Sequence, residues 1–383
     1  MVKIKSHAEK SIVSLGFLCA FGANANAQSS VTLYGVIDQS IQYASHANAN
    51  NKNFIGLGGG NLSGNRWGLR GIEDLGGGRS AVFRLESGFS PSNGSLGQGG
   101  RMFGRQAYVG LADEHLGTLT LGRQYDPLVD MIQPLTSDYL WGSPFTTPGD
   151  LDNNDNSTRT NNSVKYVSPV TSGLRFEAFY GLGGVPGAAG SGQTWSLAAS
   201  YATGPFSLAA GYVVYNNANS AAARANAWGS TATSDGNFGS QINSQFASAK
   251  ARKIASFAAQ YAAGPVTAGL RYSNVQYTPD AFSSFSSTQR YDIGAGVLDY
   301  RVAPAVILGI GYVYMHGSGN RSQTYHQISA GADYSLSKRT ELYLVGAYQH
   351  AGGDGVFAAV ADYGFNSASR SQAVVSLGIR HKF

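Results

Sequence analysis

Residues 266–273 read VTAGLRYS, and this stretch decides the fold class. Its apolar side chains stand at every second position, Leu270 and Tyr272 among them, while Arg271 falls between these two. A period of two is typical of a β-strand with one apolar and one polar face, whereas an amphipathic helix repeats every 3.6 residues. Residues 174–180 and 375–383 alternate in the same way. The sequence therefore predicts an all-β fold, although strands of a soluble sandwich also alternate.

The links between the alternating segments favour a membrane barrel over a sandwich. Very short links recur, and longer polar stretches separate them. A transmembrane barrel has tight turns at one end and longer loops at the other, so short and long links alternate along its chain. The short links are 202–205, 262–265, 302–305 and 336–340, and the long ones are 44–61, 181–193, 216–247, 278–288 and 351–370.

Counting the alternating segments predicts a transmembrane antiparallel β-barrel of about 16 strands in a single domain, residues 28–383. An even count of this size encloses a lumen wide enough for water, whereas eight strands would be filled by side chains. The predicted strand centres are Tyr34, Leu69, Phe83, Tyr108, Leu119, Tyr166, Phe176, Leu197, Ala210, Phe257, Leu270, Ala295, Ile310, Ala330, Leu344 and Leu377.

Residues 1–27 have the features of a cleaved signal peptide. Three lysines precede a short apolar run, residues 12–21, and small residues at 25–27 offer a cleavage site. The alternative is a membrane anchor, but this run is too short to cross a hydrocarbon core of roughly 30 Å as a helix. Export is therefore expected, and the only cysteine of the chain, Cys19, would leave with the signal peptide.

Charge and motif content argue against several other functions. A formal net charge of +5 is too mild to indicate a nucleic-acid partner. Residues 150–155 (DLDNND) are similar to a calcium loop but lack its glycine and glutamate, so a solvated loop is the better interpretation. The histidines accompany no nucleophile elbow and no metal-ligand spacing. We therefore expect no enzyme activity, no metal and no cofactor.

The link between Gly122 and Asn162 is unusually long and has no clear periodicity. Loops beyond about 15 residues inside a compact domain are usually functional or disordered. This one carries Tyr139, Trp141 and Phe145, among other large apolar residues, which is too apolar for plain disorder. We expect it to pack against the inside of its own barrel.

The chain resembles the trimeric general porins of Gram-negative bacteria, in their betaproteobacterial form. The resemblance implies an outer-membrane barrel of sixteen strands, a homotrimer, and an inward-folded third outer loop that forms a pore constriction. It spans the expected mature chain in order, through residues 30–38 (SVTLYGVID), 66–77 (RWGLRGIEDLGG), 105–117 (RQAYVGLADEHLG), 121–125 (LGRQY), 162–169 (NSVKYVSP) and 377–383 (LGIRHKF).

In that family, a ladder of basic residues faces acids on the inward loop. By motif position the ladder is Arg66, Arg105 and Arg159, with Arg70 and Arg84 near it, and the acids are Asp130 and Asp138. The loop departs from the enteric porins in lacking their Pro-Glu-Phe-Gly-Gly motif.

Physical reasoning supports the basic side of this constriction. An arginine on the lipid face costs about 2–4 kcal/mol at the midplane, so in-strand arginines should face the lumen. Charged rings sort ions by sign. We expect passive diffusion of small hydrophilic solutes with a mild anion preference. The alternative is that these arginines only make the inner wall of a water-filled barrel hydrophilic and do not form a constriction.

Two further sites follow from position. Arg123 shares the parity of Leu119 and Leu121, so it is expected to point outward, either snorkelling or, as we favour, in a trimer contact. Phe383, with His381 and other alternating residues before it, resembles the signal read by the barrel-assembly machinery; an ordinary last strand is the alternative.

The sequence is also compatible with two other functions. A substrate-specific channel would differ only in constriction side chains and loop shape, and a surface adhesin-like β protein would use tyrosine-rich strands for binding. The barrel implies outer-membrane lipid and lipopolysaccharide as surroundings, besides the small solutes that it would pass.

Overall fold

The computed structural model describes residues 29–224, 227–353, 355–360 and 363–383. The predicted signal peptide, residues 1–27, lies outside these ranges. The strands are β1 (Ser30–Ala44), β2 (Phe54–Gly59), β3 (Arg66–Gly76), β4 (Arg79–Gly88), β5 (Gln106–Asp113), β6 (Gly117–Gln124), β7 (Thr160–Val167), β8 (Leu174–Gly181), β9 (Thr194–Thr203), β10 (Phe206–Asn216), β11 (Ala251–Ala263), β12 (Val266–Thr278), β13 (Gln289–Ala303), β14 (Val306–Ser318), β15 (Gln323–Ser335), β16 (Thr340–Gly352) and β17 (Ser371–Lys382).

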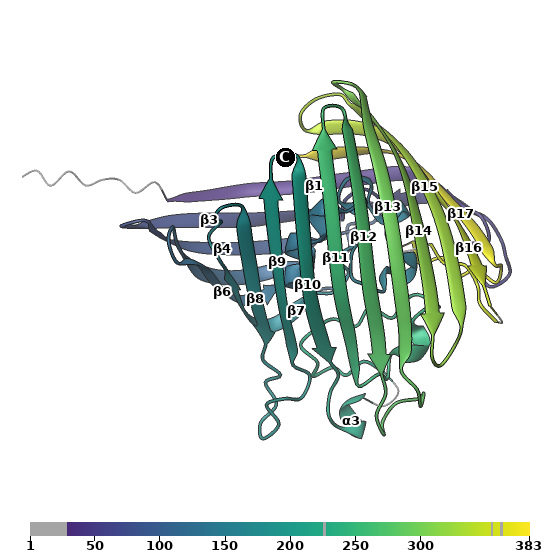
Figure 1. Cartoon of the computed structure of the whole chain (residues 1–383), viewed down its shortest axis with the longest axis horizontal. Coiled ribbons are helices and arrows are strands. Elements are labelled where there is room, and N and C mark those ends of the chain that lie inside the picture. Colours follow the sequence, from purple (N-terminus) through teal and green to yellow (C-terminus); the bar gives the residue numbers. More distant parts are fainter. Residues whose placement is uncertain (1–28, 225–226, 354, 361–362) are drawn as a thin grey trace, which may run out of the picture.

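The strands form one closed antiparallel barrel (Figure 1). Strand β1 closes it, because one edge of β1 pairs with β17 and its other edge pairs with both β2 and β3. Strands β2 and β3 are therefore two halves of one strand, and the barrel has sixteen. Each predicted strand centre lies within an observed strand. The one observed strand segment that was not predicted is β2, which falls within the predicted polar link 44–61.

Alternation along each strand separates an outer apolar face from an inner one. On β14, Leu308, Ile310 and Tyr312 are about half exposed, whereas Val313 and Met315 are buried on the other face. Outside the strands, the described residues include no helix with the length and apolar character needed to cross a membrane. The apolar bands of neighbouring strands thus form the outer surface of the barrel.

The two ends of the barrel differ in their connections, as the sequence predicted. Two-residue turns such as 264–265 and 304–305 lie at one end. The longer connections, among them 217–250 and 279–288, gather at the other, which is the lower end in Figure 1. The alternation of short and long links is therefore confirmed.

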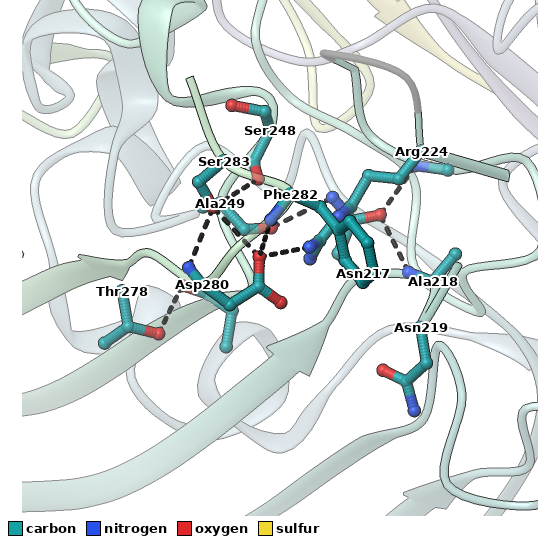
Figure 2. Close-up of polar contacts among 12 residues, drawn as sticks. Asn217, Ala218, Asn219, Arg224, Ser248, Ala249, Thr278, Asp280, Phe282 and Ser283 are labelled. Carbon is teal, nitrogen blue, oxygen red and sulfur yellow. Dashed lines mark hydrogen bonds and ion pairs between the residues drawn. The ribbon is translucent and has the colours of Figure 1, made fainter. Parts of the chain in front are cut away.

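Two of the long connections are tied to each other by polar contacts (Figure 2). Arg224, in the short helix α3 (Ala221–Arg224), pairs with Asp280 and lies over the Phe282 ring at 5.1 Å from its centroid. Ser283 Oγ donates to the carbonyl of Ser248 at 2.9 Å. These bonds join the connection after β10 to the connection after β12.

The segment between β6 and β7 contains α1 (Pro127–Met131), α2 (Asp138–Trp141) and the 3-10 turns η1 (Gln133–Leu135), η2 (Ser143–Phe145) and η3 (Pro148–Asp150). Figure 1 shows its helical turns behind β10–β13, within the curve of the sheet. Trp141 is fully buried, its indole Nε1 donates to Asp299 Oδ1 at 2.7 Å, and its ring covers Gly309 and Gly331. Gly309 alternates with the exposed Leu308 and Ile310, so this contact is on the inner face.

A buried ion pair also holds this segment to the wall. Arg271 of β12 pairs with Asp152, and its Nη2 donates to Thr147 Oγ1 at 2.8 Å. The two charged side chains are 3% and 1% exposed. Removing one partner of such a pair leaves a buried charge without compensation.

We expect Arg271→Ala to lower the free energy of unfolding by about 3–5 kcal/mol. Arg79→Ala is the control, because Arg79 is 70% exposed beside Asp113 and such surface pairs contribute about 0–1 kcal/mol. Denaturant unfolding in detergent micelles measures both. The double variant Arg271→Ala with Asp152→Ala should recover part of the loss, and equal losses for Arg271→Ala and Arg79→Ala would contradict the expectation.

Candidate functional site

A cavity of about 1190 Å³ lies between the inner wall and the segment that follows β6. Its lining mixes arginines and carboxylates, both from the wall and from the connections between strands. In the described part of the chain, five arginines and five carboxylates line it: Arg66, Arg84, Arg101, Arg105 and Arg159, and Glu86, Asp130, Asp138, Asp155 and Asp235. Of the five predicted ladder residues, only Arg70 lies outside this lining.

Glu86 organises the basic side. Its Oε1 accepts from Arg105 Nε at 2.8 Å, and its Oε2 lies 3.9 Å from Arg66 Nε and accepts from the Tyr34 hydroxyl at 2.7 Å. Glu86 is 3% exposed, so these contacts fix the two guanidinium groups. Glu86 is not among the predicted site residues, although its parity with Arg84 was a usable signal, because a carboxylate on an arginine-rich face offsets repulsion.

The Tyr125 ring joins Arg105 to the third ladder residue, Arg159. The guanidinium carbons of Arg105 and Arg159 lie 6.0 Å and 5.1 Å from its ring centroid. Arg159 Nη2 also donates to the Tyr125 hydroxyl at 3.2 Å. A cation over an aromatic face is attracted by the ring quadrupole, so one ring serves both charges. Arg66, Arg105 and Arg159 are thus brought together.

The two remaining ladder residues share a second ring. Arg84 and Arg70, which are directly paired across β4 and β3, lie 5.4 Å and 5.6 Å from the Tyr34 ring centroid. Arg84 reaches the cavity, whereas Arg70 continues the row beyond it. The row is therefore longer than the cavity.

Both predicted acids line the cavity, in different surroundings. Asp130, on α1, pairs with Lys165 of β7, so a cation from the wall holds it. Asp138 accepts from Gln133 Nε2 at 2.8 Å and from Thr136 and Asn154, and it is 2% exposed. Burial raises the pKa of Asp138 to about 6, because desolvation penalises its charged form.

The prediction that Arg123 points outward is wrong. Its guanidinium pairs with Asp235, donates to Asn161 Oδ1 at 2.7 Å and to the carbonyl of Gly104 at 2.8 Å, and the residue is 7% exposed. The pairing of β6 with β7 shifts register after Gly122, whose φ is +143°, so the parity count fails there. The parity argument for a trimer contact through Arg123 is thereby removed.

The balance of charge around the cavity favours its cations. Two of the five lining carboxylates, Asp130 and Asp235, are also bound by Lys165 and Arg123, which stand outside the lining. Over the ranges that the structure describes, no group of three or more His, Cys, Asp or Glu side chains could hold a metal ion.

The predicted assembly residues lie at the seam of the barrel. Phe383 exchanges two backbone hydrogen bonds with Gly35, at 3.0 Å and 3.1 Å, and its ring covers that glycine. His381 Nδ1 lies 2.9 Å from the Thr340 hydroxyl oxygen on the outer face. Both residues are exposed; His381 lies in β17, which pairs with β1, and Phe383 directly follows β17.

Comparison with solved structures supports this architecture. An anion-selective porin from Comamonas acidovorans has a TM-score of 0.73 with this chain, at 23% identity, over 93% of this chain and all of that one. An outer-membrane protein OmpT of Vibrio cholerae, solved in a trimer form, has a TM-score of 0.63 at 15% identity, over 93% of this chain and 99% of that one.

Sequence comparison gives closer relatives. An outer membrane porin protein of Bordetella pertussis is 31% identical over 98% of this chain and all of that protein. Outer membrane porin protein 32 of Delftia acidovorans is likewise 31% identical over 98% of this chain and its own full length. Residues 14–354 match the sequence profile of the Gram-negative porins. The chain therefore belongs to the Gram-negative porin family and is an outer-membrane porin.

Proposed function

We propose that this porin passes small hydrophilic solutes and ions by passive diffusion, with a mild preference for anions, and that residues 125–159 narrow its channel. The observation that carries the proposal is the group of arginines on Glu86 and Tyr125 inside a closed barrel. A neighbour of the same fold is described as anion-selective, which agrees with the sign of that group.

The fixed geometry of the arginines is what makes such a filter effective. Free guanidinium groups repel one another, by about 1 kcal/mol per close pair in water. Glu86 offsets this repulsion between Arg66 and Arg105, and Tyr125 holds Arg159 beside them. Guanidinium groups stay charged at any working pH. An anion crossing the cavity therefore meets a permanent positive wall.

The reversal potential in a salt gradient tests the anion preference. We expect the native channel in planar bilayers to favour anions, and Arg105→Gln to reduce that preference because one fixed cation is lost. Arg339→Gln is the control, since Arg339 lies in an exposed turn outside the cavity lining. A native reversal potential of the cation-favouring sign would refute the proposal.

The raised pKa of Asp138 predicts a pH dependence. Below about pH 6 the carboxyl is neutral and the lining loses one negative charge, so anion preference should rise between pH 7 and pH 5. Asp138→Asn removes the titrating group and should flatten that part of the profile. Identical profiles for the native channel and the variant would show that Asp138 does not contribute to the field.

We also propose that the porin is a homotrimer, surrounded by outer-membrane lipid and lipopolysaccharide, and that Phe383 with His381 is read by the barrel-assembly machinery. The trimer form of the Vibrio cholerae relative supports the first part. The exposed position of Phe383 at the closing strand supports the last, because a recognition signal must be accessible when that strand arrives.

Deleting Phe383 should lower the yield of trimer in the outer membrane. The measurement is the heat-shifted band on a gel of unheated membranes, which separates trimer from monomer. Replacing Lys382 by Ala is the matched control, because it alters the neighbouring residue and keeps the terminal aromatic ring. Normal trimer yield after the deletion would exclude the recognition role.

A further inference from the structure

The break between β2 and β3 contains more residues than the strand needs. On β1, Gln39 pairs with Gly59 and Val36 pairs with Arg66, so only two β1 residues face the break. Six residues, 60–65, fill it on the other side. A continuous strand would use two, and four are therefore in excess. All six line the cavity, so the excess folds inward.

The fold of this inward segment is fixed by Asp38. The Asp38 carboxylate accepts from the backbone N–H groups of Leu62 at 2.7 Å and Ser63 at 2.9 Å. The Asp38 backbone N–H donates to Asn65 Oδ1 at 2.6 Å, and the Asp38 carbonyl accepts from Gly60 at 3.0 Å. Asp38 is fully buried. Three backbone N–H groups of residues 60–65 are thus bonded to the one buried residue Asp38, which fixes the path of the segment.

The segment meets the loop after β6 inside the barrel. The Ser143 N–H donates to the Asn61 carbonyl at 3.0 Å, and Leu62 packs in one buried cluster with Trp141. A Cβ on Gly142 would lie 1.9 Å from the Asn61 carbonyl oxygen, so the two backbones approach too closely for any side chain there. Trp141 also covers Gly309 of β14 and Gly331 of β15. Residues 60–65 and Trp141 together form a continuous contact on the inner face from the β2–β3 break to β14 and β15.

The same segment also positions the basic wall. Arg66 Nη1 donates to the Gly64 carbonyl at 2.9 Å. A Cβ on Gly64 would lie 2.8 Å from Arg105 Nη1, so the guanidinium of Arg105 rests directly on this glycine. Arg380 Nη1 donates to Ser63 Oγ at 2.7 Å. Residues 63–64 therefore contact, and help to position, the guanidinium groups of three arginines.

We infer that residues 60–65 form a second constriction element, which sets the width of the channel jointly with residues 125–159 and fixes Arg66 and Arg105 at the narrowest zone. This inference rests on the proposed channel function. Its consequence is that the size limit for small anionic solutes depends on the length of a strand break as well as on the loop.

Deleting residues 61–64 tests the inference directly. The deletion leaves Gly60 and Asn65 to face Asp38 and Ile37, so β2 and β3 join in unchanged register. We expect a larger single-channel conductance and faster uptake of larger neutral sugars into liposomes. Deleting residues 48–51, in the exposed link after β1, removes the same number of residues away from the cavity and should leave both unchanged.

A cysteine variant keeps the test decisive if the deletion does not fold. The chain contains one cysteine, within the predicted signal peptide, so Ser63→Cys would add the only thiol of the exported protein. A bulky uncharged maleimide should lower the conductance of Ser63→Cys channels and not of Ala49→Cys channels, because Ala49 is exposed outside the cavity lining.

The outcomes separate the two claims. A native protein that forms no ion-conducting channel overturns the proposed function. A native protein that conducts, combined with unchanged conductance in the residue 61–64 deletion or after labelling Ser63→Cys, overturns the second constriction element alone.

Discussion

The pairing of β1 with β17 is the interaction on which the rest of the structure depends. A hydrocarbon environment offers no water to unpaired N–H and C=O groups, so an open sheet edge within it would be costly. Strand β1 leaves no such edge, because one of its edges pairs with β17 and the other pairs with β2 and β3. The bonds between Gly35 and Phe383 extend this seam to the last residue of the chain.

Closure also determines what the interior can hold. Once the outer face is assigned to lipid, every in-strand charge that alternates with it must be accommodated inside. On the inner wall, one partner contacts two charges at once. Glu86 pairs with two arginines, and the rings of Tyr125 and Tyr34 each lie beside two guanidinium groups. Crowded arginines can thus lie together on the inner wall, each beside a carboxylate or an aromatic ring. The selectivity proposed for the pore uses the residues that this arrangement already requires.

Much of this architecture could be predicted from sequence because it is local. Alternation located all sixteen strands, and link length located the two ends of the barrel. Parity failed where the backbone departs from regular pleating, because the register shift after Gly122 turns Arg123 inward. The short β2 (FIGLGG) was missed because, only six residues long and half glycine, it carries a brief alternation inside a polar stretch. Glu86 had a sequence signal that was not used. The contacts of Trp141 with Gly309 and Gly331 had none, because complementarity between distant segments leaves no periodic trace.

The contacts of Trp141 constrain the order in which the strands and the loop after β6 can reach their final positions during folding. Its indole donates to Asp299, which lies 158 residues further along the chain, and the glycines beneath its ring follow later still. Contacts of such separation form after the intervening chain has been placed, since loop closure costs entropy before they stabilise anything. A barrel that has not yet inserted β14 and β15 lacks the two glycines under the Trp141 ring, although Lys165 of β7 and Arg271 of β12 can already hold other parts of this loop. The part of the loop around Trp141 therefore reaches its final place only when the last third of the barrel wall is in position.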